Sequence, residues 1–210
     1  MKTKVFCFIF LLTATCGMGQ IPENISIGVY GRGESNMYRY YGGKALGNYF
    51  TTRVHNSYSA GLSVHASVNY LFNANISFGF SEANYRPDIV SQNSQLYMAS
   101  IRMWHLNTVG ELKFNDKPKF NPTLIFGFQS MFKESANEKF SAAVVEETLW
   151  PKVRIMPQLG LGFQYMPRKT RFNFRGEAGL RLNSNNRTGY DYGLSQAFAG
   201  LHILYRVKSW

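Results

Sequence analysis

The sequence between Ser57 and Tyr70 alternates strictly between apolar and polar positions. A period of two is typical of a β-strand with one apolar and one polar face. The run is longer than the roughly 5–6 residues of an average globular strand, and it can supply the about 9–11 tilted residues that cross a bilayer. Its polar face consists of Ser, Gly, Asn and one His, which suits a narrow, hydrogen-bonded interior. We therefore predict a strand of a membrane barrel whose apolar face meets lipid.

The same alternation returns along the rest of the chain and predicts seven further strands. They are Asn24–Arg32, Asn75–Ser81, Leu96–Phe114, Phe120–Phe132, Val153–Tyr165, Phe172–Leu182 and Ala197–Val207. In the segment 96–114 the apolar parity changes once, after Met103, as a β-bulge in that strand would produce. Pro157 removes one ladder hydrogen bond, so we expect it near the loop end of its strand or at a bulge.

The connections between these segments alternate in length. Short connections are expected at Leu71–Ala74, Asn115–Lys119 and Met166–Arg171, long ones at Gly33–Asn56, Glu82–Gln95 and Lys133–Lys152, and one of medium length at Asn183–Asp191. Aromatic residues gather near both ends of the strands, as interfacial girdles do. Together these patterns predict an all-β fold: an eight-stranded antiparallel up-and-down transmembrane β-barrel with short periplasmic turns and long extracellular loops.

The N-terminus has the layout of a secretory signal peptide. Lys2 and Lys4 precede the apolar stretch 5–12, and Gly17-Met18-Gly19 offers small residues for cleavage. We expect a signal peptide at 1–19 and a single barrel domain at 20–210. Cleavage before Cys16, which would leave a lipidated N-terminus, is the alternative. Cleavage after Gly19 removes both cysteines, so disulfides, thiolate metal sites and cysteine nucleophiles are excluded from the mature chain.

Composition adds a basic excess to this picture. The formal net charge is +11, while 17% of the 210 residues are charged and 16% are aromatic. An exported chain rarely meets nucleic acid, so we expect no nucleic-acid partner and take lipopolysaccharide phosphates or anionic surface polymers as the counter-charge. The expected partners are outer-membrane lipid, lipopolysaccharide and an extracellular ligand that the sequence does not identify.

Over about residues 24–208 the chain resembles the small eight-stranded bacterial outer-membrane β-barrels, the OmpA-like or OmpX-like transmembrane domains. The resemblance rests on strand pattern, loop alternation and aromatic ends, not on a motif. It implies a location in the outer membrane of a Gram-negative cell envelope and the barrel assembly machinery as a partner. The rival architecture is a soluble lipocalin-like exported barrel, which would turn its apolar face inward and show water a charged one.

The polar faces of the later strands carry the only dense candidate chemistry, and we predict an ionic network in the lumen. Its members are Glu111, Lys113, Arg154, Arg171, Arg175, Glu177 and Arg181. Unpaired charge in a low-dielectric interior is very costly, so the two glutamates should pair with arginines. Because the interior of eight strands is just wide enough for side chains, we expect a filled lumen. A narrow porin-like ion channel that opens by rearranging these pairs is the alternative.

The segment 33–56 is the candidate binding surface, because Tyr and Arg are favoured in binding sites. Its candidate residues are Tyr38, Arg39, Tyr40, Tyr41 and Arg53. A structural role and a surface-binding (adhesion or ligand-binding) role are both consistent with it. Gly31-Arg32-Gly33 is interpreted as a turn.

No histidine of the sequence belongs to a catalytic motif, and neither G-x-S-x-G nor H-E-x-x-H occurs. We therefore expect no catalytic residue, no cofactor and no metal. A lipid-modifying barrel enzyme is the remaining alternative.

Overall fold

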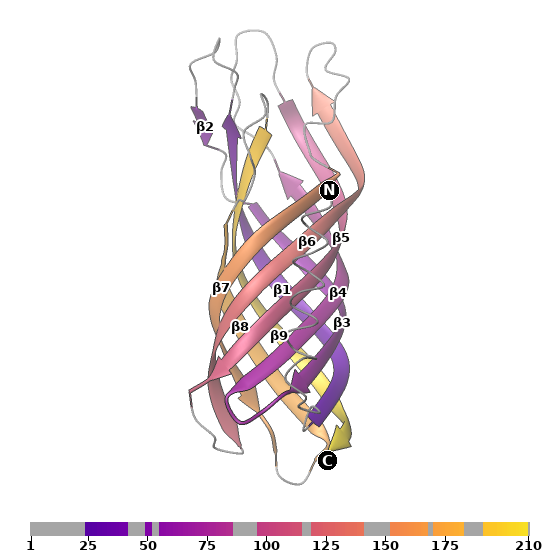
Figure 1. The fold of residues 1–210 in the computed structure, drawn as a ribbon. Helices are drawn as coiled ribbons and strands as arrows, with labels where there is room; N and C mark the ends of the chain where they lie inside the picture. The colour runs from indigo at the N-terminus through magenta and orange to yellow at the C-terminus, as the bar shows by residue number, and fades with distance from the viewer. Residues whose placement is uncertain are drawn as a thin grey trace, which may run out of the picture.

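Eight long strands wind around one axis and close into a barrel in the computed structural model (Figure 1). The structure describes residues 24–41, 49–51, 55–85, 96–114, 119–140, 152–167, 170–182 and 191–209. The strands are β1 (Asn24–Tyr41), β2 (Tyr49–Thr51), β3 (His55–Ser67), β4 (Phe72–Tyr85), β5 (Leu96–Lys113), β6 (Phe120–Phe140), β7 (Val153–Tyr165), β8 (Phe172–Arg181) and β9 (Asp191–Ser209). No α-helix long and apolar enough to cross a membrane occurs in these ranges.

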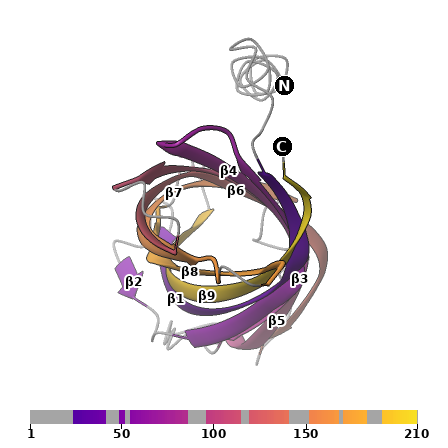
Figure 2. The ribbon, with the colours of Figure 1, turned by 90° about the horizontal axis from the view of Figure 1, so that it is seen from below.

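Strand β1 pairs with both β3 and β9, and this second pairing closes the sheet into a ring (Figure 2). All neighbouring strands are antiparallel and follow one another in chain order. The prediction of an eight-stranded antiparallel up-and-down barrel is confirmed. The short β2, which pairs only with the far end of β1 from Arg39 to Tyr41, was not predicted. We call the end with the β3–β4, β5–β6 and β7–β8 connections the turn end, and the opposite one the loop end.

The register fixes the tilt of the strands. Following cross-strand partners once around the barrel from Asn73 leads back to β4 at Ala83, ten residues further along. With eight strands about 4.8 Å apart and a rise of about 3.3 Å per residue, this stagger corresponds to a tilt of about 40°. Because of this tilt, residues that are not partners in any ladder reach the same height along the barrel axis and can meet across the interior.

Several strands run further than the hydrophobic pattern predicted. Strand β1 continues to Tyr41, so the interpretation of Gly31-Arg32-Gly33 as a turn is wrong: these residues lie within the strand and pair with β3 and β9. Likewise β6 continues to Phe140 and β9 begins at Asp191. Parts of the expected loops are therefore strands that rise from the loop end. The expected signal peptide at 1–19 lies outside the described residues.

The predicted change of parity within β5 is also wrong. A register shift does occur between Arg102 and Met103, but the extra residue is Glu134 on β6, because Ser135 and Lys133 are the successive partners. From Ile101 to Lys113 strand β5 keeps its parity, and Ile101 and Met103 are buried inside the barrel. They lie with Met131 and Met156, which are equally buried, and give the interior an apolar layer towards the loop end. The sequence predicted a bulge because these inward residues are apolar, like those of the outer face.

Two prolines sit in barrel strands without interrupting a ladder. Pro157 lies just beyond Gln158 and Arg181, the last pair of the β7–β8 ladder at its loop end, as expected. Pro122 lies just beyond Lys113 and Thr123, the last pair of the β5–β6 ladder at its turn end. In both cases the missing N–H points to where the neighbouring strand ends, so at most a terminal hydrogen bond is lost.

The wall is apolar outside and polar inside. Large apolar side chains are exposed on all eight long strands, from Ile27 on β1 to Val207 on β9. At the turn end an outward aromatic girdle is exposed, formed by Tyr70, Phe114, Phe120, Tyr165, Phe172 and Tyr205. Rings of this girdle pack edge to face or stacked, as Phe172 does with Tyr205 at 5.6 Å between centroids. This polarity is the reverse of what a soluble lipocalin-like barrel requires.

Candidate functional site in the barrel interior

A chain of four buried charges crosses the interior. Arg175 Nε on β8 donates to Glu111 Oε1 on β5, and Arg175 Nη1 lies 2.8 Å from Glu177 Oε2. Arg32 Nε on β1 donates to Glu177 Oε1 at 2.8 Å. The side chains are at most 1% exposed. Since β5 and β8 are not neighbours in the sheet, the Glu111–Arg175 ion pair joins opposite walls of the barrel.

A second cluster lies closer to the loop end and centres on Glu34. Arg181 Nη1 donates to Glu34 Oε1 at 2.9 Å, and the hydroxyls of Ser57 and Ser59 donate to the two carboxylate oxygens at 3.1 and 3.3 Å. Arg181 also donates to Gln196 Oε1 at 3.1 Å. Every carboxylate of the interior thus has an arginine partner, which is what the cost of burying charge demands.

Aromatic and imidazole rings fill the space between the two clusters. Two guanidinium groups lie over the Phe198 ring. That of Arg181 on β8 is 4.1 Å from the ring centroid, and that of Arg32 on β1 is 5.4 Å from it. Tyr30 stacks on His202 at 5.2 Å between centroids, and its hydroxyl is hydrogen-bonded to His105 Nε2 on the far wall. These contacts add a second connection across the interior.

The structure brings three of the predicted network residues together, Glu111, Arg175 and Glu177, and places a fourth, Arg181, in the second cluster with Glu34. Lys113 is half-buried at the turn end, where its Nζ donates to Ser67 Oγ at 3.2 Å. Arg154 is buried near the loop end, as the register partner of Met131. Arg171 does not belong to the interior: it precedes β8, is exposed, and donates to the Tyr205 hydroxyl at 3.3 Å.

The sequence interpretation missed Arg32 and Glu34, the two charged residues that β1 contributes. The signal that could have found them is parity, because Ser26, Tyr30, Arg32, Glu34 and Asn36 continue one polar face. All five are buried in the interior. The two glycines beside Arg32 concealed this continuation, since glycines usually mark turns.

The candidate binding residues belong to the loop end of the barrel. The backbone of Tyr38–Tyr41 lies in β1 and pairs with β9. The side chains of Tyr38, Arg39, Tyr40 and Tyr41, and the whole of Arg53, lie outside the described residues. Their role as a binding surface stays a prediction.

A row of uncharged polar residues crosses the wall formed by β4, β5 and β6, on the loop-end side of Glu111. Ser77, Asn107 and Gln129 are register partners across these three strands, and each is 0% exposed. Among the described residues, no group pairs with the Ser77 hydroxyl or with any side-chain nitrogen or oxygen of the two amides. Buried polar groups are normally hydrogen-bonded, so this row is unusual.

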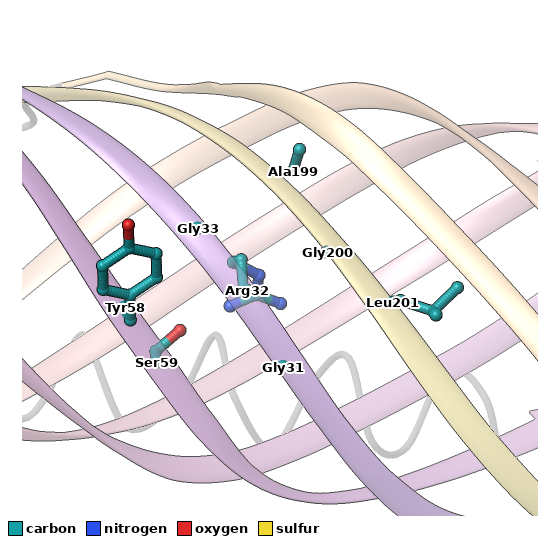
Figure 3. Close-up of a pocket in the computed structure, with 8 residues that line it drawn as sticks. All are labelled: Gly31, Arg32, Gly33, Tyr58, Ser59, Ala199, Gly200 and Leu201. Carbon is teal, nitrogen blue, oxygen red and sulfur yellow. The ribbon is translucent and has the colours of Figure 1, made fainter.

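The outer face has a groove of about 560 Å³ where β3, β1 and β9 run side by side (Figure 3). Its floor includes Gly31 and Gly33, where a Cβ atom would meet nothing within 4 Å. Tyr58 and Leu201 stand on either side of these glycines. The groove opens outward, away from the charged interior, and its rim is apolar apart from the Tyr58 hydroxyl.

In the described part of the chain, no group of three or more His, Cys, Asp or Glu residues is arranged to hold a metal ion.

Solved structures share this architecture. The outer membrane protein OprG from Pseudomonas aeruginosa superposes with a TM-score of 0.57 at 10% sequence identity, covering 90% of this chain and 99% of its own. Ail, the attachment invasion locus protein of Yersinia pestis, gives a TM-score of 0.43 at 11% identity, covering 89% and 99%. No family model and no curated protein sequence matches the chain. At such identities the likeness to OprG establishes a common barrel fold.

Proposed function

We propose that the chain is an outer-membrane β-barrel protein that stands in lipid and has a structural or surface-binding role at its loop end. The observation that carries the proposal is the reversed polarity of the wall. Charged side chains that would be expected at the surface of a soluble protein, such as Arg175 and Glu177, are buried inside. Side chains that would form a soluble core, such as Leu159 and Phe128, are exposed at 60% and 48%. Lipid is the solvent in which this arrangement is favourable.

The height of the apolar band supports the same proposal. On β4 the band begins at Phe72 and ends at Glu82, which forms an exposed ion pair with Arg102. Ten residues at about 3.3 Å each, tilted by about 40°, span about 25 Å, the height of the apolar band of outer-membrane barrels. Among the described outward-facing residues between these two levels, none is charged.

The interior contacts favour a closed barrel over a channel. The Glu111–Arg175 ion pair, the Tyr30–His105 hydrogen bond and the contact of Gln164 with His65 at 3.1 Å all join strands that are not neighbours. Opening an ion path would separate buried charges from their partners, at several kcal/mol for each pair. The role then belongs to the loop end, for which the tyrosines and arginines at 38–41 and 53 are the candidate contacts.

Gel mobility tests the architecture. An embedded barrel of this kind should resist detergent at room temperature, so an unboiled sample should migrate differently from a boiled one. The test uses protein extracted from membranes, and a boiled aliquot of the same sample is its control. Identical mobility before and after boiling would contradict the barrel in a membrane.

Planar-bilayer recordings separate the closed barrel from a channel. We expect the wild-type protein to give no discrete conductance above background. Discrete steps in the wild type that change size in Arg175→Ala would instead support the channel alternative.

If the barrel is closed, substitutions at the loop end, such as Tyr40→Ala with Tyr41→Ala, should reduce binding of the cells to anionic surface polymers without changing heat-modifiable mobility.

A further inference from the structure

The row formed by Ser77, Asn107 and Gln129 has side-chain donors and acceptors that the surrounding protein does not hydrogen-bond. Each amide presents a donor and an acceptor, and the hydroxyl can act as either. In the residues that the structure describes, none of these five polar atoms meets a protein partner. A buried polar group without a hydrogen-bond partner loses its interaction with water and gains nothing in exchange, so a whole row without partners would carry a large penalty.

The three side chains are close enough to act on one molecule. Directly opposed residues of neighbouring antiparallel strands have Cβ atoms about 4.5–5.5 Å apart. Ser77 faces Asn107 across the β4–β5 ladder, and Asn107 faces Gln129 across the β5–β6 ladder. All three point into the barrel, so their polar ends form one continuous surface.

Neighbouring residues do not supply the missing partners. Gly79 and Gly127, the next inward positions on β4 and β6, carry no side chain into the interior beside the row. Towards the loop end the row is bordered by Met131 and by His105, whose Nε2 is hydrogen-bonded to Tyr30 instead. On β7 the register partner of Gln129 is Met156, which is buried and apolar. The carboxylates of the interior already have arginine partners on β1 and β8.

From this geometry we infer that the row binds a small uncharged molecule that carries both a hydrogen-bond donor and an acceptor. Water is the smallest such molecule, and an amide or a polyol of a few heavy atoms is the next. A charged ligand fits poorly, because the row offers no formal charge to neutralise one inside the barrel. The interior then contains two kinds of polar group: charged side chains that pair with one another, from β1, β5 and β8, and the neutral row on β4–β6, which pairs with a guest.

Side-chain amide NMR of the ¹⁵N-labelled protein, folded in detergent micelles, tests this inference directly. We expect the NH₂ groups of Asn107 and Gln129 to give cross-peaks with long-lived water, or to shift saturably when acetamide or glycerol is added. Cross-peaks alone identify water as the guest, and saturable shifts identify a site that admits the solute.

The barrel provides a matched control pair in Asn36 and Gln196. Gln196 Nε2 donates to Asn36 Oδ1 at 2.6 Å, and Asn36 Nδ2 donates to Ser57 Oγ at 2.8 Å, so both amides have protein partners. Their NH₂ groups should show neither the water contact nor the solute shift. If Asn107 and Gln129 behave in the same way as this pair, the inference is wrong.

Two variants make the result specific to the row. Asn107→Leu should abolish the water contact or solute shift of Gln129 and leave the signals of Gln196 unchanged. If that variant fails to fold, as its gel mobility would reveal, Ser77→Ala is the second variant, because it removes only one hydroxyl. It should weaken the affinity of the row for its guest, measured at the Gln129 NH₂ group, about fivefold, which corresponds to one ordinary hydrogen bond. An undiminished Gln129 signal in the folded variant would overturn the site.

Discussion

Arg175 and Glu111 face each other from opposite walls of the barrel and form a buried ion pair across its interior. The same guanidinium lies 2.8 Å from Glu177, so one side chain gives two buried carboxylates their counter-charge. Glu177 also pairs with Arg32 on β1 and lies 3.4 Å from His202 Nε2 on β9. Arg175 thus connects β8 to β5 directly and to β1 through Glu177, and the consequences of removing it can be estimated.

Arg175→Met should destabilise the folded barrel strongly, because it leaves Glu111 without its arginine and Glu177 with one arginine instead of two. Breaking a buried pair by removing one partner typically costs about 3–5 kcal/mol. The measurement is the free energy of unfolding in urea, for protein folded into lipid vesicles. Combining it with Glu111→Gln should recover part of the loss, because the second substitution removes the uncompensated charge.

The exposed pair Glu82–Arg102 is the matched control for this experiment. Its atoms are 3.3 Å apart, but the side chains are 41% and 57% exposed. An exposed ion pair contributes at most about 1 kcal/mol, so Arg102→Met should change the free energy of unfolding by no more than that. Equal losses for the two arginine variants would contradict a buried, dry location for Arg175.

Phe198→Leu should cost about 2 kcal/mol of unfolding free energy. The ring lies under the guanidinium of Arg181 at 4.1 Å and near that of Arg32 at 5.4 Å, and a buried cation–π contact contributes up to about 2 kcal/mol. Leucine keeps the apolar character but has no π-system. Phe128→Leu on the outer face, where no arginine contacts the ring, should cost less than about 1 kcal/mol in the same urea titration. A larger loss of unfolding free energy for Phe128→Leu than for Phe198→Leu would contradict the cation–π explanation.

The space available to a new side chain differs between Gly79 on the inner face of the wall and Gly31 on the outer face. At Gly79 a Cβ atom would collide with the Ala60 carbonyl and the Tyr30 hydroxyl, and at Gly31 it would meet nothing within 4 Å. Gly79→Ala should therefore destabilise the barrel, because the β3–β4 ladder must shift. Gly31→Ala should be neutral or stabilise by about 0.4–1 kcal/mol, since it only restricts the unfolded chain. Both variants are compared by thermal loss of the unboiled gel band.

The barrel could be predicted from the sequence because its wall separates polarity so cleanly. In Ser57–Tyr70 every inward position is Ser, Gly, Asn or His, so parity alone places each side chain. The same rule failed where the interior is apolar: Ile101 and Met103 carry the character of the outer face but point inward. It also failed on β1, where Gly31 and Gly33 are strand residues. Hydrophobicity identifies a face only if the face is uniform.

Pairing across the interior depends on a quantity that no local pattern contains. The sequence placed Glu111, Arg175 and Glu177 on inward faces, but the stagger of ten residues decides which strands' side chains reach the same height. With a different stagger Arg181 would meet another partner instead of Glu34. Strand pairing is chosen collectively when the barrel closes, so the identity of each ion pair follows from the tertiary fold.

A depth series on β7 tests whether lipid surrounds the wall. Leu159 is the central residue of β7 and is 60% exposed, whereas Val153 is its first residue and is 51% exposed. In water the two positions would accept arginine almost equally. In a bilayer, arginine costs about 2–4 kcal/mol at the midplane and about 0–1 kcal/mol near the interface. We expect Leu159→Arg to lower the unfolding free energy in vesicles by the larger amount and Val153→Arg by the smaller, with Leu159→Ala as the control for lost apolar area. Equal effects of arginine at both positions would place the wall in water, and the apolar outer face would then need a protein partner to cover it.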